Sequence, residues 1–246
     1  MATDAASTTG SSSTSTSGEG TGGSSTTVEG STSETGEGTG ATTAASTTST
    51  TTTTTGEPAC LTYDSDEEEF APVQIVGAGL APGADGLTWS EPTIYQYIGP
   101  FSGVPGQPAS HEGADYVHAD EGVAAIDVKA AADGVVVYVR TGCPQSQLFG
   151  FNNALRECGS GWGNHVIVDH GAGVFTRYAH LHPDAAPVSV GDVVSRGDVV
   201  GTMGNSGRSD ERHLHFELAS HAGALDPCAP AQSLELVYDP SGLPFQ

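Results

Sequence analysis

The apolar residues of the chain form short runs separated by glycine, proline and aspartate from about residue 70 onwards, without an amphipathic helical period. The run Val135–Val139 follows the turn Ala132-Asp133-Gly134, and Asp-Gly beside an apolar run predicts a β-hairpin. Further strands are predicted over residues 166–170, 174–180, 188–194, 197–201 and 213–217. Short, evenly spaced strands with turn residues between them predict an all-β domain, an antiparallel barrel or sandwich.

Three stretches refine this expectation. The run Val166-Ile167-Val168 is apolar at both parities, which predicts a strand buried on both faces. Residues 70–110 are rich in Pro and Gly, with apolar runs at 73–76 and 93–97, so short strands and long loops are expected there. Residues 141–161 interrupt two strands, and their Phe149, Phe151 and Leu155 need cover. We expect this insertion to fold onto the domain or to rim a cleft, with one short helix near residues 152–157.

Residues 1–58 differ from the rest in composition. They consist almost entirely of Ser, Thr, Gly, Ala and Glu, contain no Lys or Arg, and have Val28 as their one large aliphatic residue after Met1. Such a segment cannot bury enough apolar surface to offset the entropy lost on ordering. We therefore expect a disordered spacer over residues 1–58, followed by a solvated acidic linker at residues 64–69, with a calcium site in that acidic run as the alternative.

The charge of the chain excludes several function classes. Its 246 residues carry 30 acidic and 7 basic side chains, a formal net charge of -23. Nucleic-acid binding depends on clustered Lys and Arg, so this balance argues against it, and it also disfavours an anionic membrane surface. No stretch approaches the ~20 apolar residues of a membrane-spanning helix.

Four cysteines, Cys60, Cys143, Cys158 and Cys228, suggest export to an oxidising compartment. Cys143 and Cys158 flank the insertion, and a disulfide between them would contribute roughly 3 kcal/mol on the chain-entropy model. Cys60 and Cys228 bracket the ordered part and would pair by elimination; four reduced, buried thiols are the alternative. The first residues lack the basic and apolar regions of a signal peptide. We therefore expect a secretion or lipid-anchor signal upstream of this sequence, and a secreted, periplasmic or cell-surface location.

The candidate chemistry lies in three histidine-containing motifs. His213-Leu214-His215 is expected on a strand, where alternate side chains share a face, so the two imidazoles would point into one space. Two solvated histidines on an edge strand are the alternative interpretation. Upstream, His111 and Asp115 stand four residues apart, and His180 ends another predicted strand. A catalytic zinc site needs three protein ligands, commonly His or carboxylate, and one open position.

Together these motifs resemble the lysostaphin-type (LytM-like) zinc endopeptidases, which cleave peptidoglycan cross-bridges. The likeness rests on His111-Glu112-Gly113-Ala114-Asp115, on Tyr178-Ala179-His180-Leu181 and on His213-Leu214-His215-Phe216-Glu217, with matching connecting segments over about 111–221. Two segments depart from the family pattern: residues 122–128 are longer than usual, and Asp210-Glu211-Arg212 replaces the usual small residues. Both departures concern substrate preference more than the metal site.

The resemblance implies a site and a mechanism. His111, Asp115 and His215 would bind Zn²⁺, and His180 and His213 would be the catalytic pair. His213 would accept a proton from water and pass it to the leaving amine, and His180 would orient the water or hydrogen-bond the oxyanion. Tyr178, which shares a strand face with His180 by alternation, would line the site or belong to the core. The remaining acidic and histidine side chains near these motifs are interpreted as structural or solvated: His118, Asp120, Asp127, His165, His170, His182 and His221.

The sequence thus predicts a lysostaphin-like (duplicated hybrid motif) metallopeptidase that acts on peptidoglycan peptides as a monomer. We expect an N-terminal extension over residues 59–110, a zinc metallopeptidase domain over 111–221 and a C-terminal extension over 222–246. The alternative is a non-catalytic domain of the same fold that regulates another cell-wall hydrolase. Such regulators typically lose ligands, whereas all five positions are present here, which favours the enzyme.

Overall fold

The computed structural model describes residues 71–94, 97–118, 120–184 and 186–246. The chain divides into two units, Met1–Thr52 and Thr53–Gln246, and all of the described residues belong to the second. The predicted spacer at 1–58, the acidic linker at 64–69 and the predicted Cys60–Cys228 pairing therefore lie outside the described residues.

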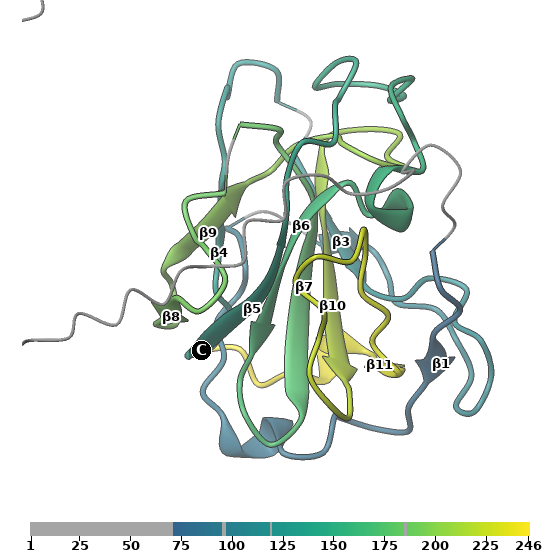
Figure 1. Cartoon of the computed structure of the whole chain (residues 1–246), viewed down its shortest axis with the longest axis vertical. Coiled ribbons are helices and arrows are strands. Elements are labelled where there is room, and N and C mark those ends of the chain that lie inside the picture. Colours follow the sequence, from purple (N-terminus) through teal and green to yellow (C-terminus); the bar gives the residue numbers. More distant parts are fainter. Residues whose placement is uncertain (1–70, 95–96, 119, 185) are drawn as a thin grey trace, which may run out of the picture. The chain divides into compact units, whose positions relative to one another are not determined.

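Eleven strands and three short 3-10 helices make up the described part of the chain (Figure 1). The strands are β1 (Ile75–Val76), β2 (Tyr97–Gly99), β3 (Ala114–Val117), β4 (Asp127–Lys129), β5 (Gly134–Arg140), β6 (Asn164–Asp169), β7 (Val174–Leu181), β8 (Val193–Val194), β9 (Val199–Thr202), β10 (His213–Ser220) and β11 (Leu236–Tyr238). The helices are η1 (Ala84–Gly86), η2 (Cys158–Gly161) and η3 (Pro240–Gly242). None of the described helices is long and apolar enough to cross a bilayer. The predicted all-β class is confirmed.

Nine strands form one sheet, in the order β1-β11-β10-β7-β6-β5-β8, with β3 beside β10 and β2 beside β3; β4 and β9 form a second sheet. The pairings are antiparallel except β1 with β11, which are parallel. The expected antiparallel system is therefore correct for all but this pair. The strands β10 and β7, at the centre, carry the longest uninterrupted pairing.

Apolar side chains cover both faces of the central strands. On one face of β10, Leu214, Phe216 and Leu218 pack with Tyr178 and with side chains from the β4–β9 sheet. On the other face, Ala219 packs with Ile167 and with Leu234 from the C-terminal segment. The predicted two-sided burial of Val166, Ile167 and Val168 is confirmed, since all three are fully buried. The face of β10 that carries Ala219 is polar at the N-terminal end of the strand, where His213 and His215 lie. A functional site can therefore form at that end.

The hairpin predicted at Asp133-Gly134 is wrong. After this turn β5 pairs with β6 and β8, whereas β4, before the turn, pairs with β9 in the smaller sheet. The Asp-Gly turn therefore carries the chain from one sheet to the other. The chain does turn at Asp-Gly, but tertiary packing selected the partner of the strand after it.

The helix expected near residues 152–157 is also wrong. The side chain of Asn152 accepts hydrogen bonds from the backbone N–H groups of Ser146 and Ala154 and donates to the Gly207 carbonyl. Leu155 has a positive φ of 26°, which no α-helix contains. Asn side chains often satisfy backbone groups outside a helix in this way. The segment is a loop that ends in the short helix η2.

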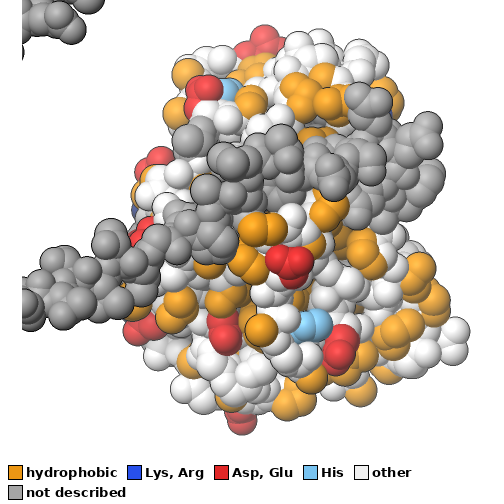
Figure 2. Space-filling view, viewed as in Figure 1, with side chains coloured by type: hydrophobic (Ala, Val, Ile, Leu, Met, Phe, Trp, Pro, Cys, Tyr) orange, Lys and Arg blue, Asp and Glu red, His pale blue; other side chains and the backbone are white. Residues whose placement is uncertain are grey.

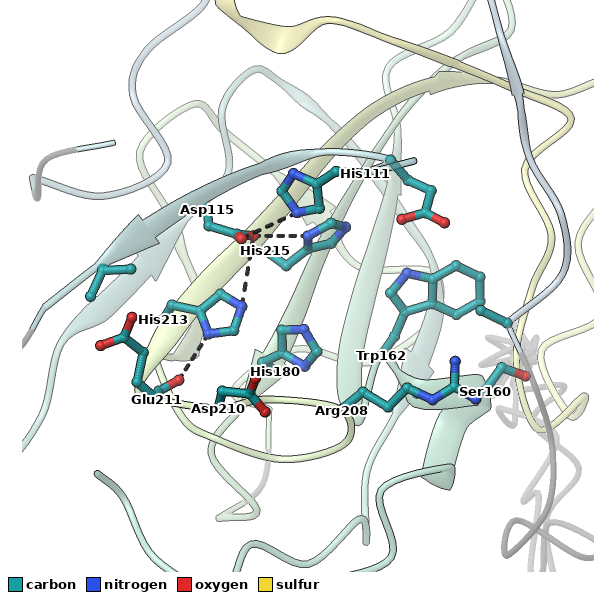
Figure 3. A pocket seen from close by; sticks show the side chains of 14 residues that line it. His111, Asp115, Ser160, Trp162, His180, Arg208, Asp210, Glu211, His213 and His215 are labelled. Carbon is teal, nitrogen blue, oxygen red and sulfur yellow. Dashed lines mark hydrogen bonds and ion pairs between the residues drawn. The ribbon is translucent and has the colours of Figure 1, made fainter. Parts of the chain in front are cut away.

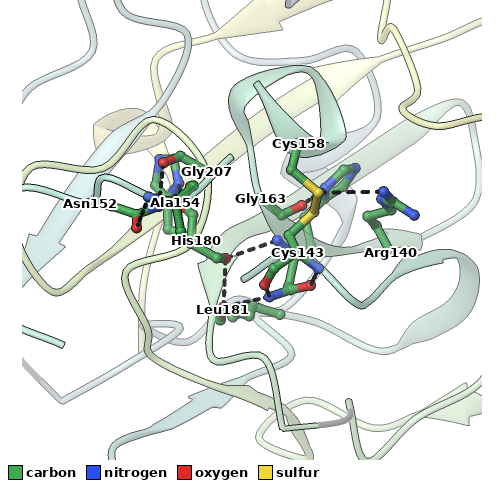
Figure 4. The surroundings of a disulfide bond; sticks show 12 residues. Arg140, Cys143, Asn152, Ala154, Cys158, Gly163, His180, Leu181 and Gly207 are labelled. Atoms are coloured by element: carbon green, nitrogen blue, oxygen red, sulfur yellow. Dashed lines mark hydrogen bonds between the residues drawn. A yellow bond between two sulfur atoms is a disulfide. The ribbon is translucent and has the colours of Figure 1, made fainter. Parts of the chain in front are cut away.

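The insertion 141–161 is closed by the predicted disulfide between Cys143 and Cys158, whose Cα atoms are 5.6 Å apart (Figure 4). It folds onto the domain as expected, against the loop 204–212 that leads into β10. Asn205 donates to the carbonyls of Gln147 and Gly150, and Arg156 donates to the Ser209 carbonyl. The apolar side chains that were expected to need cover are only partly covered: Phe151 and Leu155 remain 49% and 42% exposed.

The molecular surface agrees with the sequence charge. On the face shown in Figure 2, acidic side chains are scattered among apolar ones, and basic side chains are scarcely visible. That face offers no clustered Lys and Arg for a phosphate backbone.

Candidate active site

A pocket of about 360 Å³ lies where the N-terminal end of β10 meets β3 and the end of β7 (Figure 3). Its lining contains the five side chains predicted to form the site, together with residues of the insertion and of the loop before β10. The lining residues are Ala71, His111, Glu112, Asp115, Val117, Ser160, Gly161, Trp162, His180, Arg208, Asp210, Glu211, His213 and His215.

Strand register brings three of the predicted residues together. Asp115 on β3 is the direct antiparallel partner of His215 on β10, and opposite residues of such a pair project to the same face. His111 stands just before β3, where its backbone pairs with that of Ser102. Metal-ligating atoms of His111, Asp115 and His215 lie within 4.8 Å of one another.

The Asp115 carboxylate links these imidazoles. Its Oδ2 lies 3.2 Å from His111 Nε2, its Oδ1 lies 3.0 Å from His215 Nδ1, and Oδ1 is 3.7 Å from His213 Nε2. Burial alone would raise the pKa of the Asp115 carboxyl. The hydrogen bonds with His111 and His215 outweigh burial and hold this pKa well below its usual range. Asp115 therefore stays an anion in this site.

The two histidines beside Asp115 are driven towards the charged form. The hydrogen bond with Asp115 raises the pKa of His111 above its usual value. Burial opposes charge on His215, but hydrogen bonds with Asp115 and Glu217 raise its pKa to about 10. Protons are shared between these two imidazoles and the Asp115 carboxylate. A divalent cation can replace such protons, because the same nitrogen and oxygen atoms are metal ligands.

The other two histidines of the pocket behave in the opposite way. His180 and His213 lie side by side, with ring centroids 4.6 Å apart. Burial is the largest cause that lowers the pKa of each ring, and His213 also lowers that of His180. Both rings are therefore neutral at neutral pH and able to accept a proton.

Backbone carbonyls fix the tautomer of these two rings. The Nδ1 of His180 lies 2.8 Å from the Ser206 carbonyl, and the Nδ1 of His213 lies 2.8 Å from the Glu211 carbonyl. A carbonyl oxygen only accepts, so each Nδ1 carries the proton and each Nε2 presents a lone pair. In His213 that Nε2 points towards Asp115.

His180 reaches the pocket through a strained backbone. It has a positive φ of 57°, and the β6–β7 register shifts at this point, so that Ala179 and His180 stand opposite His165 alone. This is a β-bulge, and bulges of this kind re-aim side chains beside active sites. The backbone N–H of His180 donates to the Trp162 carbonyl at 2.9 Å, which holds the bulge in place.

The bulge overturns the expectation that Tyr178 and His180 share a face. Tyr178 is fully buried in the apolar core, where its hydroxyl accepts a hydrogen bond from the Ala131 N–H and contacts Thr176 Oγ1. Without the extra residue, His180 would follow Tyr178 into the core. Tyr178 is thus a core residue, whereas His213 and His215 do share the pocket face as predicted.

Several residues in the pocket lining or directly behind it were not among the predicted site residues. Ser160, Trp162 and Arg208 come from the end of the insertion and from the loop before β10, and Glu217 and Arg177 lie behind His215. For Glu217 the pattern offered a clue, because it continues the alternation of His213 and His215. The histidine and aspartate residues that were interpreted as structural or solvated do not line the pocket. Among them, His165 is fully buried.

Comparison with known proteins finds a family model that matches the part of the chain that carries this site. Residues 109–227 match the family model of peptidase family M23. The DD-carboxypeptidase/endopeptidase Mpg of Neisseria meningitidis serogroup B is 33% identical over 146 residues, which cover 57% of this chain and 28% of that relative. The murein hydrolase activator NlpD of Escherichia coli is 33% identical over 140 residues, which cover 57% of this chain and 30% of that relative.

A solved structure gives a more distant likeness. The catalytic domain of the antimicrobial peptidase lysostaphin from Staphylococcus simulans is 23% identical, with a TM-score of 0.35, and the likeness covers 54% of this chain and 89% of that chain. The chain spans about three tenths of the length of the two curated relatives. Residues 109–227 of this chain are therefore a domain of peptidase family M23.

Proposed function

We propose that this chain is a zinc-dependent endopeptidase that hydrolyses peptide bonds in peptidoglycan, in cross-bridges or stem peptides. The observation that carries the proposal is the convergence of His111, Asp115 and His215 beside the neutral pair His180 and His213 in one pocket. The M23 match of residues 109–227 and the similarity to the DD-carboxypeptidase/endopeptidase Mpg support the reaction class.

The donor set fits zinc. The Nδ1 of His111 donates to the Pro100 carbonyl at 2.8 Å, which leaves Nε2 as its ligand atom, and His215 turns its Nδ1 towards Asp115. Two imidazoles and one carboxylate are a common ligand set of catalytic zinc sites. A zinc ion held there would supply Lewis-acid chemistry, polarising a substrate carbonyl and lowering the pKa of water.

The residues of the chain then divide the remaining work. His213, neutral and with its Nε2 directed at the cluster, accepts a proton from the attacking water and gives it to the leaving amine. His180 offers only an acceptor at Nε2 while it is neutral, so it orients the water rather than donating to an oxyanion. Asp115 supplies a negative charge that favours a cation once the two imidazoles have given up their extra protons.

The location follows from the same proposal. Peptidoglycan lies outside the cytoplasm, and the Cys143–Cys158 disulfide fits an oxidising compartment. A secreted, periplasmic or cell-surface protein agrees with both. The expected monomeric state stays a prediction.

The test is digestion of purified peptidoglycan by the full chain, with products identified by mass spectrometry. We expect peptide cleavage that a chelator abolishes and added zinc restores, and no cleavage by Asp115→Ala. The control is His182→Ala, which alters a histidine outside the pocket. Absence of products from the zinc-loaded wild-type chain would refute the enzyme.

The second candidate is a regulator, which the similarity to the activator NlpD favours. In that case the chain would yield no products alone but would increase the products of a second wall hydrolase. Asp115→Ala would leave this stimulation intact. The complete pocket argues for the first candidate.

A further inference from the structure

A fully buried ion pair lies directly behind His215. The Nε of Arg177 on β7 is 3.0 Å from Glu217 Oε2 on β10, and neither side chain is exposed to solvent. The two residues are antiparallel partners, so they project to the same face as His215. The other oxygen of the carboxylate, Oε1, lies 3.2 Å from His215 Nε2.

This ion pair is a costly feature for an apolar interior. Replacing a buried ion pair with apolar residues is often neutral or stabilising, so stability alone does not account for it. The pair is nevertheless firmly held: Arg177 donates to the Gln232 carbonyl at 2.6 Å, and its guanidinium lies 3.6 Å from the Trp162 ring centroid. Two anchors keep Arg177 in place, and Arg177 in turn fixes the Glu217 carboxylate.

His215 differs from the other histidines of the pocket. His111, His180 and His213 each donate Nδ1–H to a backbone carbonyl, which leaves Nε2 facing the pocket. His215 has the opposite orientation: its Nδ1 faces Asp115, and its Nε2 meets the side chain of Glu217. Its tautomer therefore depends on a side chain rather than on the backbone.

We propose that Glu217, held by Arg177, is the positioning residue for His215: it accepts the Nε2–H and so directs the Nδ1 lone pair to the metal. The proposal rests on the zinc site of the proposed function. Partners of this kind fix the ring orientation of metal-ligating histidines, and their loss typically weakens metal binding 10–100-fold.

Glu217→Gln tests the proposal with almost no change of shape. The Gln oxygen is needed by the Arg177 donors, so the amide NH₂ faces His215 Nε2 and donates to it. The amide donor excludes a proton from Nε2, so the ring keeps its proton on Nδ1, the atom that should bind the metal. We expect zinc affinity about 10–100-fold weaker in competition with a chromophoric chelator. ¹⁵N NMR of the metal-free protein should show His215 Nε2 protonated in the wild type and unprotonated in the variant.

Glu157→Gln is the matched control. Glu157 pairs with Arg208 on the loop side of the pocket and contacts none of the pocket histidines through that carboxylate. The same chemical change there should leave zinc affinity and the His215 NMR signature as in the wild type.

The double variant Arg177→Leu/Glu217→Leu separates positioning from folding. It removes both charges, so its unfolding midpoint in urea should equal or exceed that of the wild type. Zinc affinity should nevertheless fall at least as far as in Glu217→Gln. If it does not fold, the single variant decides.

The outcomes are distinct. Wild-type zinc affinity together with an unchanged Nε2 signature in Glu217→Gln would overturn the positioning role. A wild-type chain that binds no zinc would refute the proposed function instead, and the NMR comparison would still decide whether Glu217 fixes the His215 proton.

Discussion

The two sides of the pocket are built by different means. On the sheet side, Asp115 and His215 are held in the backbone ladder between β3 and β10, and their register fixes which atoms meet. On the loop side, Ser160, Trp162 and Arg208 come from two irregular segments: the insertion, which a disulfide closes, and the loop before β10, which side-chain hydrogen bonds join to it. The sheet side thus carries the proposed chemistry, and the loop side shapes the space in which a substrate would lie.

This difference between the sheet side and the loop side predicts which residues of the pocket tolerate substitution. Loops on a rigid scaffold tolerate change, whereas a one-residue slip in a strand moves every side chain to the other face. Several contacts join the two sides, among them the hydrogen bonds from the His180 N–H to the Trp162 carbonyl and from the His180 Nδ1 to the Ser206 carbonyl. We expect variants on the sheet side to affect turnover and variants on the loop side to affect stability and substrate binding.

The largest effect is expected from His213→Ala on the sheet side. Loss of a general base typically costs on the order of 10²–10⁴-fold in rate, so kcat for peptidoglycan peptides should fall by that factor. Zinc content should stay at the wild-type level because His213 is outside the proposed ligand set. His182→Ala, outside the pocket, is the control. Wild-type turnover by zinc-loaded His213→Ala would contradict the proton-transfer role.

An intermediate effect is expected from Cys143→Ala/Cys158→Ala on the loop side. The bond closes a separation of 15 residues, for which the chain-entropy model gives about 3 kcal/mol of stability. Urea unfolding should show a loss of this size. KM should rise because η2 and Trp162 line the pocket, while zinc content stays unchanged. Loss of zinc in this variant would show that the two sides are not separable.

The smallest effect concerns pH and His165, which is fully buried beneath the insertion, next to Gly159. Burial, helped by the charge of Arg177, lowers the pKa of His165 well below 6.5. The unfolded chain therefore binds a proton that the folded chain does not, so the stabilisation is complete above about pH 6.5 and is lost as pH falls below it.

His165→Phe removes this contribution. Between about pH 6.5 and pH 5 the free energy of unfolding should fall less steeply than in the wild type, by up to about 1.4 kcal/mol per pH unit for one proton. Urea unfolding across that range measures the slope. The residual slope reflects other buried histidines such as His170, whose pKa is also lowered, chiefly by burial. An unchanged slope would mean that His165 takes up a proton in the folded state.

Part of the site followed from spacing along a strand, and the rest from the resemblance to a known family. Alternation along a strand places His213 and His215 on one face, and the structure has them there. The resemblance of the motifs to lysostaphin-type endopeptidases supplied His111, Asp115 and His180, which all line the same pocket. Local periodicity sufficed for His213 and His215 because both lie on one regular strand, β10.

Prediction failed where non-local contacts decide. Alternation placed Tyr178 with His180, but a β-bulge held by the Trp162 carbonyl separates them. The Asp-Gly turn predicted a hairpin, but the strand after it found its partners in another sheet. Neither the register shift nor the choice of partner leaves a trace in the local pattern.

By itself, the sequence determined the strand-rich class, the acidic surface, the insertion with its disulfide and the shared face of His213 and His215, because these depend on composition and on short periods. The other three site positions came from the resemblance to a known family. Only the tertiary structure decided the tautomers of those histidines, the left-handed turn of His180 and the Arg177–Glu217 pair behind His215. Such features arise where segments distant in sequence supply a carbonyl, a carboxylate or a ring to one another, and no local pattern of residues records these contacts.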